Sequence, residues 1–310
     1  MVVRVKNLVK RYGDLLALDH LSFSVNDGEV FGLLGPNGSG KTTAINCLLS
    51  LLDYDKGTIE IFGQPMAPDA YHIKRDIGIV MQNVAVYNEL TVRENIDYFC
   101  GLYVPDKKSR KELVAEAIEF AGLTEFIDYY PQKLSGGLLR RLNIACGIAH
   151  KPKLIIMDEP TVAVDPQSRN KILEGIMALN RQGATVIYTT HYMEEVEQIC
   201  SRILIIDKGR AIATGTKEEL KAMITMEEKI TVETHPLTRE QLARLRSLPH
   251  ILSAEYQGGL LVIKSGRGGH NLEIVLDFIR KEKIHCGKIY SELPTLNDVF
   301  LEITGKHLRD

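Results

Sequence analysis

A glycine-rich stretch constrains the fold of this chain more than any other feature of its sequence. Residues 35–42 read Gly-Pro-Asn-Gly-Ser-Gly-Lys-Thr and match the pattern G-x-x-x-x-G-K-[ST]. The stretch follows a continuous apolar run at residues 30–34, which is typical of a strand buried on both faces of a parallel sheet. Residues 42–52 have the pattern of a helix. This order of strand, glycine loop and helix predicts that backbone N–H groups and a helix N-terminus enclose phosphate groups.

The side chains of this loop predict how a triphosphate would be held. Glycines let the backbone N–H groups turn inward, Lys41 reaches the β- and γ-phosphates, and the Thr42 hydroxyl ligates Mg²⁺. The predicted binding residues of the loop are Gly35, Pro36, Asn37, Gly38, Ser39, Gly40, Lys41, Thr42 and Thr43.

A second apolar run, residues 154–157, ends in two acids. Asp158 is predicted to hold Mg²⁺, directly or through water, and Glu159 to orient and deprotonate the attacking water. Carboxylates at the C-terminal end of a strand lie where open α/β sheets bind ligands. A strand followed by a solvated acidic turn is the alternative for this segment alone, but the phosphate loop upstream favours catalysis.

The remaining sequence alternates apolar runs with helical patterns, which indicates an α/β sheet with crossover helices. Helical periodicity dominates from about residue 95 to residue 149. Near residue 225 the pattern changes, and short strands are predicted at 230–233, 251–256, 260–263 and 288–292, with a helix at 272–281. The sequence therefore predicts a large α/β domain and a small C-terminal α+β domain at residues 225–310.

Composition narrows the classes of partner. With 38 basic and 40 acidic side chains the formal net charge is -2. This charge gives no indication that the chain binds a nucleic acid or an anionic membrane surface. The five cysteines are widely spaced without a C-x-x-C pair, which disfavours a disulfide framework or a zinc site and favours a reducing compartment. No stretch approaches the roughly 20 apolar residues of a membrane span, and the start lacks the apolar segment of a secretory signal. If this chain drives transport, another polypeptide must supply the path.

Many protein families have a phosphate loop, and one tetrapeptide of this sequence points to a single family among them. Residues 134–137, Leu-Ser-Gly-Gly, resemble the signature motif of the ABC-transporter ATPases. The resemblance implies a P-loop NTPase cassette at residues 1–222, with a mixed sheet core and a helical subdomain at about 84–150, that binds ATP and Mg²⁺ and hydrolyses ATP. In that family the motif caps the γ-phosphate held by another cassette, so ATP joins two cassettes head to tail. The residues concerned are Ser135, Gly136 and Gly137.

Four further residues match functional positions of the family in order. Tyr12 resembles the aromatic that stacks on adenine, and Gln82 resembles the glutamine that senses Mg²⁺ and water and begins the loop facing the transmembrane partner. Asp165 resembles the aspartate that crosses the dimer interface, and His191 resembles the histidine that contacts the γ-phosphate. An ordinary strand tyrosine and a polar strand-end residue are the alternatives for Tyr12 and Gln82. The resemblance implies a catalytic set of Glu159, His191, Lys41 and Gln82 and a metal-binding set of Thr42, Gln82 and Asp158.

The sequence departs from the family pattern in two places. Leu138 follows the signature where a glutamine or another polar or flexible residue is usual, so a side-chain contact to the partner's nucleotide is expected to be missing. Ala163 and Val164 stand where a Gly-Leu pair is common, and their extra methyl groups are expected to tighten or strain the dimer interface. Both departures bear on the rate and symmetry of hydrolysis.

Three segments, at residues 87–95, 191–197 and 293–300, resemble the branch whose partners are type-2 ABC permeases, mostly exporters. This resemblance implies a motor subunit held at the cytoplasmic face of the cell membrane by an integral membrane permease. It also implies pairing with a second cassette, identical or different, and no nucleic acid partner. A plain dimerisation or folding extension is the alternative for the C-terminal segment.

Two other functions fit the same motifs. A soluble ABC ATPase of translation or DNA repair would have no membrane partner, but such proteins usually carry two cassettes or long coiled coils, and this chain has one cassette and no sustained heptads. A regulatory cassette would bind ATP without cleaving it. Glu159 and His191 disfavour that function, whereas Leu138 leaves it open.

Overall fold

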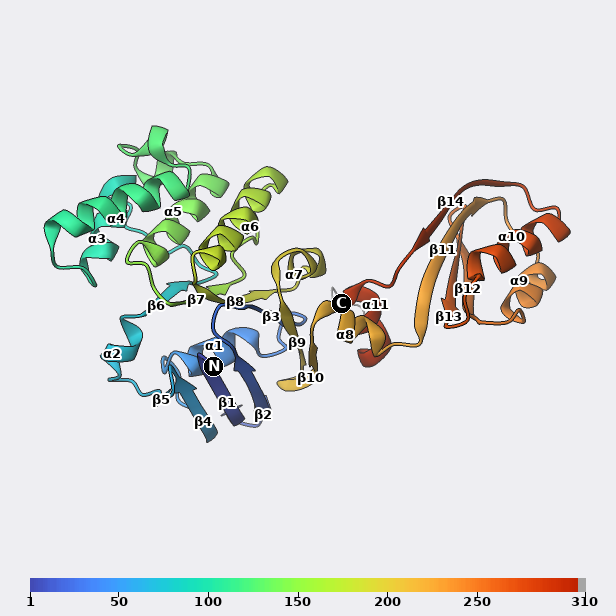
Figure 1. Cartoon of the computed structure of the whole chain (residues 1–310), viewed down its shortest axis with the longest axis horizontal. Helices are drawn as coiled ribbons and strands as arrows, with labels where there is room; N and C mark the ends of the chain where they lie inside the picture. The colour runs from blue at the N-terminus through green and yellow to red at the C-terminus, as the bar shows by residue number, and fades with distance from the viewer. Residues whose placement is uncertain (306–310) are drawn as a thin grey trace. The chain divides into compact units, whose positions relative to one another are not determined.

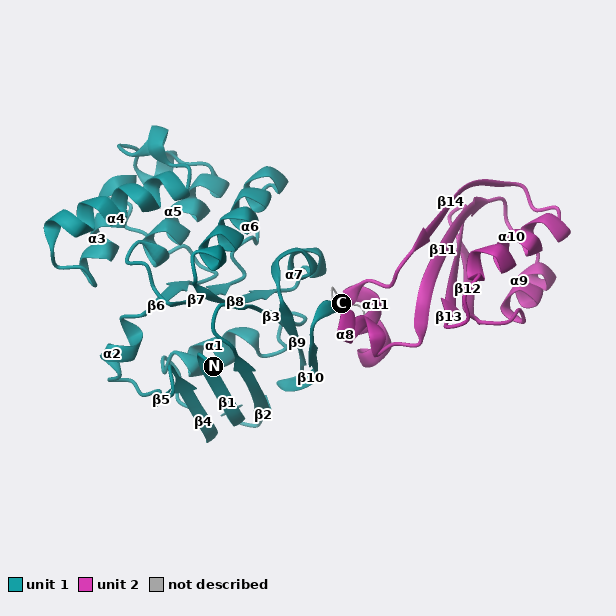
Figure 2. Cartoon of the chain, in the orientation of Figure 1, with its two compact units in different colours: residues 1–217, 308–310 teal, residues 218–307 magenta. Residues whose placement is uncertain are grey.

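The computed structural model describes residues 1–305, which divide into two compact units (Figures 1 and 2). Unit 1 comprises residues 1–217, and unit 2 begins at residue 218. The short helix α8 (Lys217–Ala222), which the sequence assigns to the cassette, lies in unit 2 apart from its first residue. Each unit has its own apolar core.

A six-stranded mixed sheet forms the centre of unit 1. Its strand order is β10-β9-β3-β8-β7-β6, with β3 (Val30–Leu34) buried along its whole length. All neighbouring strands are parallel except β10, which is antiparallel to β9. The other strands are β6 (Ile77–Val80), β7 (Leu154–Asp158), β8 (Thr185–Thr190), β9 (Arg202–Asp207) and β10 (Arg210–Gly215). Parallel strands end at one edge of the sheet. The glycine loop, Gln82, Glu159 and His191 follow strand ends at that edge, and Asp158 is the last residue of β7.

An antiparallel sheet with the order β2-β1-β4-β5 packs against the same core. Its strands are β1 (Val3–Tyr12), β2 (Leu15–Val25), β4 (Lys56–Ile61) and β5 (Gln64–Pro65). The sequence predicts only short strands at residues 1–34, but β1 and β2 form one long hairpin with bulges at its register shifts. Helix α1 (Lys41–Leu48) shares the core and ends earlier than predicted, because Ser50 adopts a left-handed conformation with φ 50°.

Three helices make the helical subdomain of unit 1: α3 (Val92–Gly101), α4 (Lys107–Phe120) and α5 (Gly136–Ile148). Their apolar faces form a separate cluster that includes Ile96, Ile118 and Leu142. The helices α2 (Tyr71–Lys74), α6 (Pro166–Arg181) and α7 (Met193–Ile199) complete the unit, with the short 3-10 turns Thr124–Phe126 and Pro131–Lys133. Among residues 1–305, no helix combines the length and apolar character that a membrane crossing needs.

Unit 2 contains an antiparallel sheet with the order β12-β13-β11-β14. Its strands are β11 (Met226–Thr234), β12 (Ile251–Gln257), β13 (Leu260–Gly266) and β14 (Cys286–Glu292). Helices α9 (Arg239–Arg246) and α10 (Asn271–Lys281) cover one face of the sheet (Figure 1), with Leu245 and Phe278 in the shared apolar core. Helix α11 (Leu296–Thr304) follows β14. The helices α9 and α11 were not predicted, although the capping boxes at Thr238 and Thr295 mark where they begin.

Candidate active site

The glycine loop between β3 and α1 has the geometry of an anion cradle. Gly38 and Gly40 have φ angles of 78° and 107°, which side chains rarely tolerate, and Gly40 is the N-cap of α1. A Cβ on Gly35 would lie 2.3 Å from the Ile206 carbonyl oxygen. The Ser39 hydroxyl is buried without a hydrogen-bond partner. An unpartnered donor beside a helix N-terminus fits a phosphate group, because both favour negative charge.

Lys41 lies across this loop. Its Nζ donates to the carbonyl oxygens of Gly35 at 2.8 Å and Pro36 at 3.1 Å, and lies 3.3 Å from Glu159 Oε1. Only 5% of the residue is exposed. Burial lowers the pKa of Lys41, while the neighbouring carboxylates of Glu159 and Asp158 act in the opposite direction. The lysine is therefore held within reach of both the loop and the acidic strand end.

The predicted metal-binding residues Thr42 and Asp158 meet directly. Asp158 Oδ2 accepts a hydrogen bond from Thr42 Oγ1 at 2.9 Å, and Oδ1 accepts one from Thr189 Oγ1 at 2.5 Å. Within residues 1–305 there is no group of three or more histidine, cysteine or acidic side chains that could hold a metal alone. One carboxylate and one hydroxyl fit Mg²⁺, because that ion completes its shell with water and phosphate oxygens.

Glu159 is the point where the predicted catalytic residues converge. Its Oε2 lies 3.4 Å from Gln82 Nε2 and 3.4 Å from His191 Nδ1, while Lys41 faces its other oxygen. The Glu159 backbone is left-handed, with φ 47°, and its N–H donates to the carbonyl oxygen and hydroxyl of Thr189. The residue is 6% exposed. A buried carboxylate with a lysine, a glutamine and a histidine around it can orient a water and accept its proton.

One cavity of about 810 Å³ joins these groups. Tyr12 lines this cavity, and Lys10 Nζ lies over its ring, 5.3 Å from the ring centroid. Because Tyr12 is 48% exposed, part of its ring surface is open for stacking. The predicted residues that line the cavity are Tyr12, Asn37, Gly38, Gly40, Lys41, Thr42, Thr43, Gln82, Glu159 and His191. Gly35, Pro36, Ser39 and Asp158 do not line it. Gly35 and Pro36 accept hydrogen bonds from Lys41, Asp158 accepts one from Thr42, and Ser39 carries the unpartnered hydroxyl of the loop.

The other predicted residues form a second group outside that cavity. Ser135 is the exposed N-cap of α5, and its Oγ accepts from Leu138 N–H at 3.3 Å. Asp165 is the exposed N-cap of α6, and the hydrogen bond it accepts from Ser168 N–H lowers its pKa. A Cβ on Gly137 would lie 2.2 Å from Ser168 Oγ and 3.0 Å from Asp165 Oδ2. The two helix N-termini, with Gly136, therefore form one surface, here called the signature surface.

The two departures from the family pattern have visible consequences. The Leu138 side chain packs against the core of the helical subdomain, so only its backbone N–H serves the cap at Ser135. Ala163 adopts a left-handed conformation with φ 59°, which suits glycine and strains alanine. Val164 is buried.

Comparisons with known proteins agree with this geometry. The family model described as ABC transporter matches residues 18–162, and a model of the DrrA1-3-like C-terminal domain matches residues 215–304. The linearmycin resistance ATP-binding protein LnrL of Bacillus subtilis is 39% identical over 100% of both chains. The Nod factor export ATP-binding protein I of Burkholderia orbicola is 36% identical over 98% of this chain and 97% of its own. The chain belongs to the ABC transporter family.

Solved structures support the same conclusion for the cassette. A dimeric ATP-binding cassette in a post-hydrolysis state with ADP and Pi matches with a TM-score of 0.64 at 28% identity, over 69% of this chain and 98% of that one. An ATP-binding subunit of an ABC transporter matches with a TM-score of 0.66 at 26% identity, over 72% and 93%. The predicted P-loop NTPase fold is thus confirmed, and this ABC protein is an ATP-binding subunit with ATPase activity.

Sequence reasoning missed residues that hold the ABC site in place. Glu195, in α7, is buried and accepts hydrogen bonds from Tyr188 Oη at 2.8 Å and Thr190 Oγ1 at 2.9 Å, which fixes the turn that carries His191. Burial raises the pKa of Tyr188 well above its usual value. Arg140 is 4% exposed and bonds to the loops of Gln82 and Glu159. Its spacing along α5, on the buried face with Gly137 and Ile144, was the available signal.

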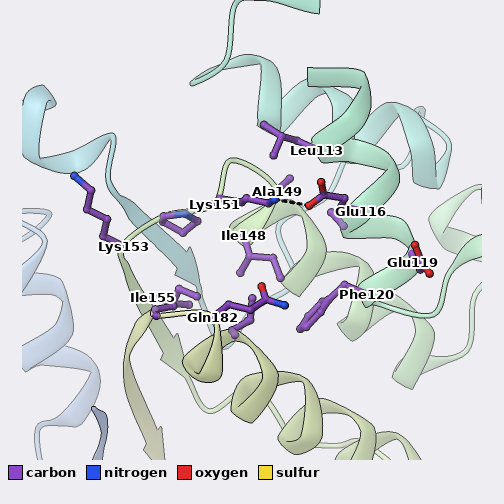
Figure 3. Close-up of a pocket in the computed structure, with 15 residues that line it drawn as sticks. Leu113, Glu116, Glu119, Phe120, Ile148, Ala149, Lys151, Lys153, Ile155 and Gln182 are labelled. Atoms are coloured by element: carbon purple, nitrogen blue, oxygen red, sulfur yellow. Dashed lines mark ion pairs between the residues drawn. The ribbon is translucent and has the colours of Figure 1, made fainter. Parts of the chain in front are cut away.

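A further cavity, of about 470 Å³, lies where α4, the end of α5 and the end of α6 meet (Figure 3). Apolar side chains such as Leu113, Phe120 and Ile148 surround it, and Lys151 forms an ion pair with Glu116 at one side. None of the residues predicted to bind nucleotide lines this cavity. It is therefore distinct from the cavity that Lys41 and Glu159 line.

Proposed function

We propose that this ABC subunit hydrolyses ATP with Glu159 as general base, and that hydrolysis drives export through a separate integral membrane permease. The observation that carries the chemistry is the convergence of Lys41, Gln82 and His191 on the Glu159 carboxylate. These groups line one cavity with the glycine loop and Tyr12. No other cluster of titratable residues in the described part of the chain has this arrangement next to an anion cradle.

Each of these residues has a separate role in the proposed reaction. The loop N–H groups and Lys41 hold the β- and γ-phosphates, and Tyr12 stacks on the adenine. Glu159 takes the proton of the attacking water, while Gln82 and His191 orient that water and the γ-phosphate. Thr42 and Asp158 would hold Mg²⁺, directly or through water. The ion, when bound, neutralises phosphate charge as it develops.

The signature surface supports a composite site made by two cassettes. Ser135, Gly136 and Asp165 are exposed and lie outside the cavity that contains Lys41 and Glu159. A helix N-terminus that is capped by its own serine and turned to solvent can receive the γ-phosphate of a nucleotide held by another chain. The solved post-hydrolysis relative is a dimer. The second cassette is either another copy of this chain or a different one.

The helical subdomain offers a surface for the permease. Two exposed tyrosines meet beside the loop after Gln82. Tyr87 in that loop and Tyr98 in the second half of α3 are each 44% exposed, and their ring centroids are 4.9 Å apart. Tyr98 also lines a groove of about 810 Å³ between α3 and α4. Exposed aromatic patches of this kind mark protein interfaces. Docking here would place the subunit peripherally at the cytoplasmic face of the membrane, with no nucleic acid partner.

Export is supported by the names of the relatives, a linearmycin resistance protein and Nod factor export proteins. The named cargoes differ although the chains align over nearly their full lengths, which fits a motor that leaves cargo recognition to the permease. Leu138 N–H still donates to Ser135 Oγ, so this departure leaves the N-cap of α5 intact. Phosphate release separates hydrolysis from the rival regulatory cassette, which would bind ATP without cleaving it.

The test is affinity capture of the full chain from detergent-solubilised membranes of its host, followed by mass spectrometry. We expect a multi-span membrane protein to co-purify. The variant Tyr98→Asp should lose this protein and keep its basal phosphate release, whereas the matched variant Tyr290→Asp, at a tyrosine of unit 2 that is 46% exposed, should retain it. Capture of soluble partners only, across several detergents, would favour the soluble ATPase instead.

A further inference from the structure

Arg140 is a buried arginine that ties two catalytic loops to helix α5. Its guanidinium donates five hydrogen bonds, all to main-chain carbonyl oxygens. On the β6 side the acceptors are Met81 at 3.0 Å and Gln82 at 2.7 Å. On the β7 side they are Glu159 and Pro160 at 2.7 Å, with Asp158 at 3.5 Å. One side chain is thus hydrogen-bonded to the backbone of the segment that carries Gln82 and to the backbone of the segment that carries Glu159.

Burying the Arg140 guanidinium costs free energy unless other groups compensate its charge. Arg140 is 4% exposed, and burial lowers the pKa of its guanidinium. No carboxylate within residues 1–305 makes an ion pair with it at 4.0 Å or less. Carbonyl oxygens accept all five of its hydrogen bonds, and the charges of Asp158 and Glu159 favour the guanidinium cation from farther away. A planar fork with five N–H donors can satisfy several carbonyls at fixed angles, which a flexible ammonium group cannot do.

The hydrogen bond from Arg140 bears directly on the backbone conformation of Glu159. With φ 47°, this residue occupies a left-handed conformation that is rare and strained for a side-chain-bearing residue. Such a conformation persists only when its surroundings hold it. Its N–H donates to Thr189 at the end of β8, and its C=O accepts from Arg140. The peptide groups on both sides of the glutamate are therefore fixed, and with them the direction of its carboxylate.

The helix that carries Arg140 is itself seated tightly. A Cβ on Gly147 of α5 would lie 2.6 Å from the Ile79 carbonyl oxygen of β6, and one on Gly78 would lie 2.5 Å from the Gly147 carbonyl oxygen. The same helix begins at Ser135, on the signature surface. Five residues of α-helix span about 7.5 Å, so Ser135 and Arg140 belong to one short rigid rod.

We propose that Arg140 is a positioning residue that aligns Glu159 with Gln82 and does so only while α5 is seated on the sheet. Displacement of α5 at its N-terminus is transmitted through the guanidinium to both loops. The catalytic carboxylate of one cavity is thereby made to depend on the helix that presents the signature surface of the same chain. This inference rests on the proposed role of Glu159 as the base.

The test compares three variants of the full chain with the wild type: Arg140→Gln, Arg140→Lys and Arg141→Lys. The neighbouring Arg141 is the matched control, because it lies on the same helix but donates to Ala121 and Gly122 of the helical subdomain. Phosphate release is measured against ATP concentration, nucleotide affinity by direct binding, and backbone mobility by hydrogen exchange of peptides that cover Gln82 and Glu159.

We expect kcat to fall about 10²-fold in Arg140→Gln, the scale of a 1 Å misplacement of a catalytic group. Arg140→Lys keeps the charge without the fork and should lose about tenfold, while KM and ATP affinity stay within about threefold of wild type in both variants. Exchange should accelerate in the two loops. Arg141→Lys should match the wild type in kcat and in loop exchange.

Each outcome is decisive. Wild-type kcat in both Arg140 variants overturns the inference, and so does an equal loss of kcat, ATP affinity and melting temperature in both, which would make Arg140 merely structural. A Glu159→Gln chain assayed in parallel separates this result from the proposed function. If that chain hydrolyses ATP normally, the assignment of the base fails; if it is inactive while the Arg140 variants are not, only the positioning role fails.

Discussion

The two units of the chain bury polar groups in opposite ways. In unit 1, Lys41, Arg140, Asp158, Glu159 and Glu195 are each no more than 6% exposed, and four of them meet around one cavity or its loops. In the described part of unit 2, the buried polar side chains are only Ser265 and Asn271, both uncharged. Buried charge is costly unless it is paired, so it is kept where it does chemistry. The contrast supports the proposal that unit 1 carries the catalytic residues.

Unit 2 is instead explained by simple amphipathic packing. One face of its sheet supplies Ile230, the inner face of α9 supplies Leu245 and that of α10 supplies Phe278. The opposite side of each helix is polar. Capping boxes mark the beginnings of its helices α9 and α11. A domain built in this way should tolerate changes of charge and lose stability, without loss of chemistry, when its core is cut.

The largest difference between the two units is expected when one carboxylate in each is replaced by an amide. Glu159→Gln removes the proton acceptor and keeps the shape, so phosphate release should fall by at least about 10²-fold while ATP binding persists. The matched change Glu255→Gln, at an exposed position of unit 2, should have no effect on phosphate release. The measurement is steady-state phosphate release with nucleotide binding assayed separately. Equal effects of the two changes would abolish the contrast between the units.

Cutting the core of unit 2 tests the comparison from the other side. Phe278→Ala removes a ring that is 7% exposed between α10 and the sheet, and should destabilise unit 2 by about 3–4 kcal/mol. Urea unfolding followed by hydrogen exchange in each unit would report this loss. Phosphate release below the unfolding transition should stay near the wild-type rate. A loss of hydrolysis as large as that in Glu159→Gln would mean that unit 2 takes part in the chemistry.

The smallest effect concerns strain in the loops of unit 1. Ala163 has φ 59°, so Ala163→Gly removes about 1–2 kcal/mol of steric cost, partly offset by the greater freedom of glycine in the unfolded chain. A net gain of about 0.5–1 kcal/mol in the free energy of unfolding is expected. The control Ala115→Gly, in the exposed face of α4, should instead lose about 1 kcal/mol. If both changes destabilise the chain, the strain at Ala163 is not real.

The parts of the site that the sequence predicts are those whose signal is local. The glycine loop and the pair Asp158-Glu159 each follow an apolar strand directly, so strand, loop and chemistry are encoded within a few residues. The parallel sheet then brings them to one edge. Tyr12, Gln82 and His191 have weaker local signals and were assigned through the family resemblance, and all three line the same cavity.

What the sequence does not predict depends on contacts between distant segments. Arg140 reaches carbonyl groups of Gln82 and Glu159, which are 58 and 19 positions away in the chain. Periodicity can place Arg140 on a buried face but cannot name its acceptors. Thr189 is similar, because it looks like any strand residue until β8 pairs with β7 and its hydroxyl meets Asp158. The short helices α7 and α9 fall below the length at which a periodic pattern is distinct.

The central claim is that each chain holds two halves of different sites, a cavity around Glu159 and a signature surface at Ser135. Mixing two inactive full-length variants, Glu159→Gln and Ser135→Glu, tests it most directly. If the sites are shared between chains, half of the dimers are mixed and each mixed dimer has one site with both halves intact. We therefore predict about a quarter of the wild-type rate of phosphate release from the mixture. A mixture no more active than the two variants measured separately would contradict sites shared between two copies of this chain.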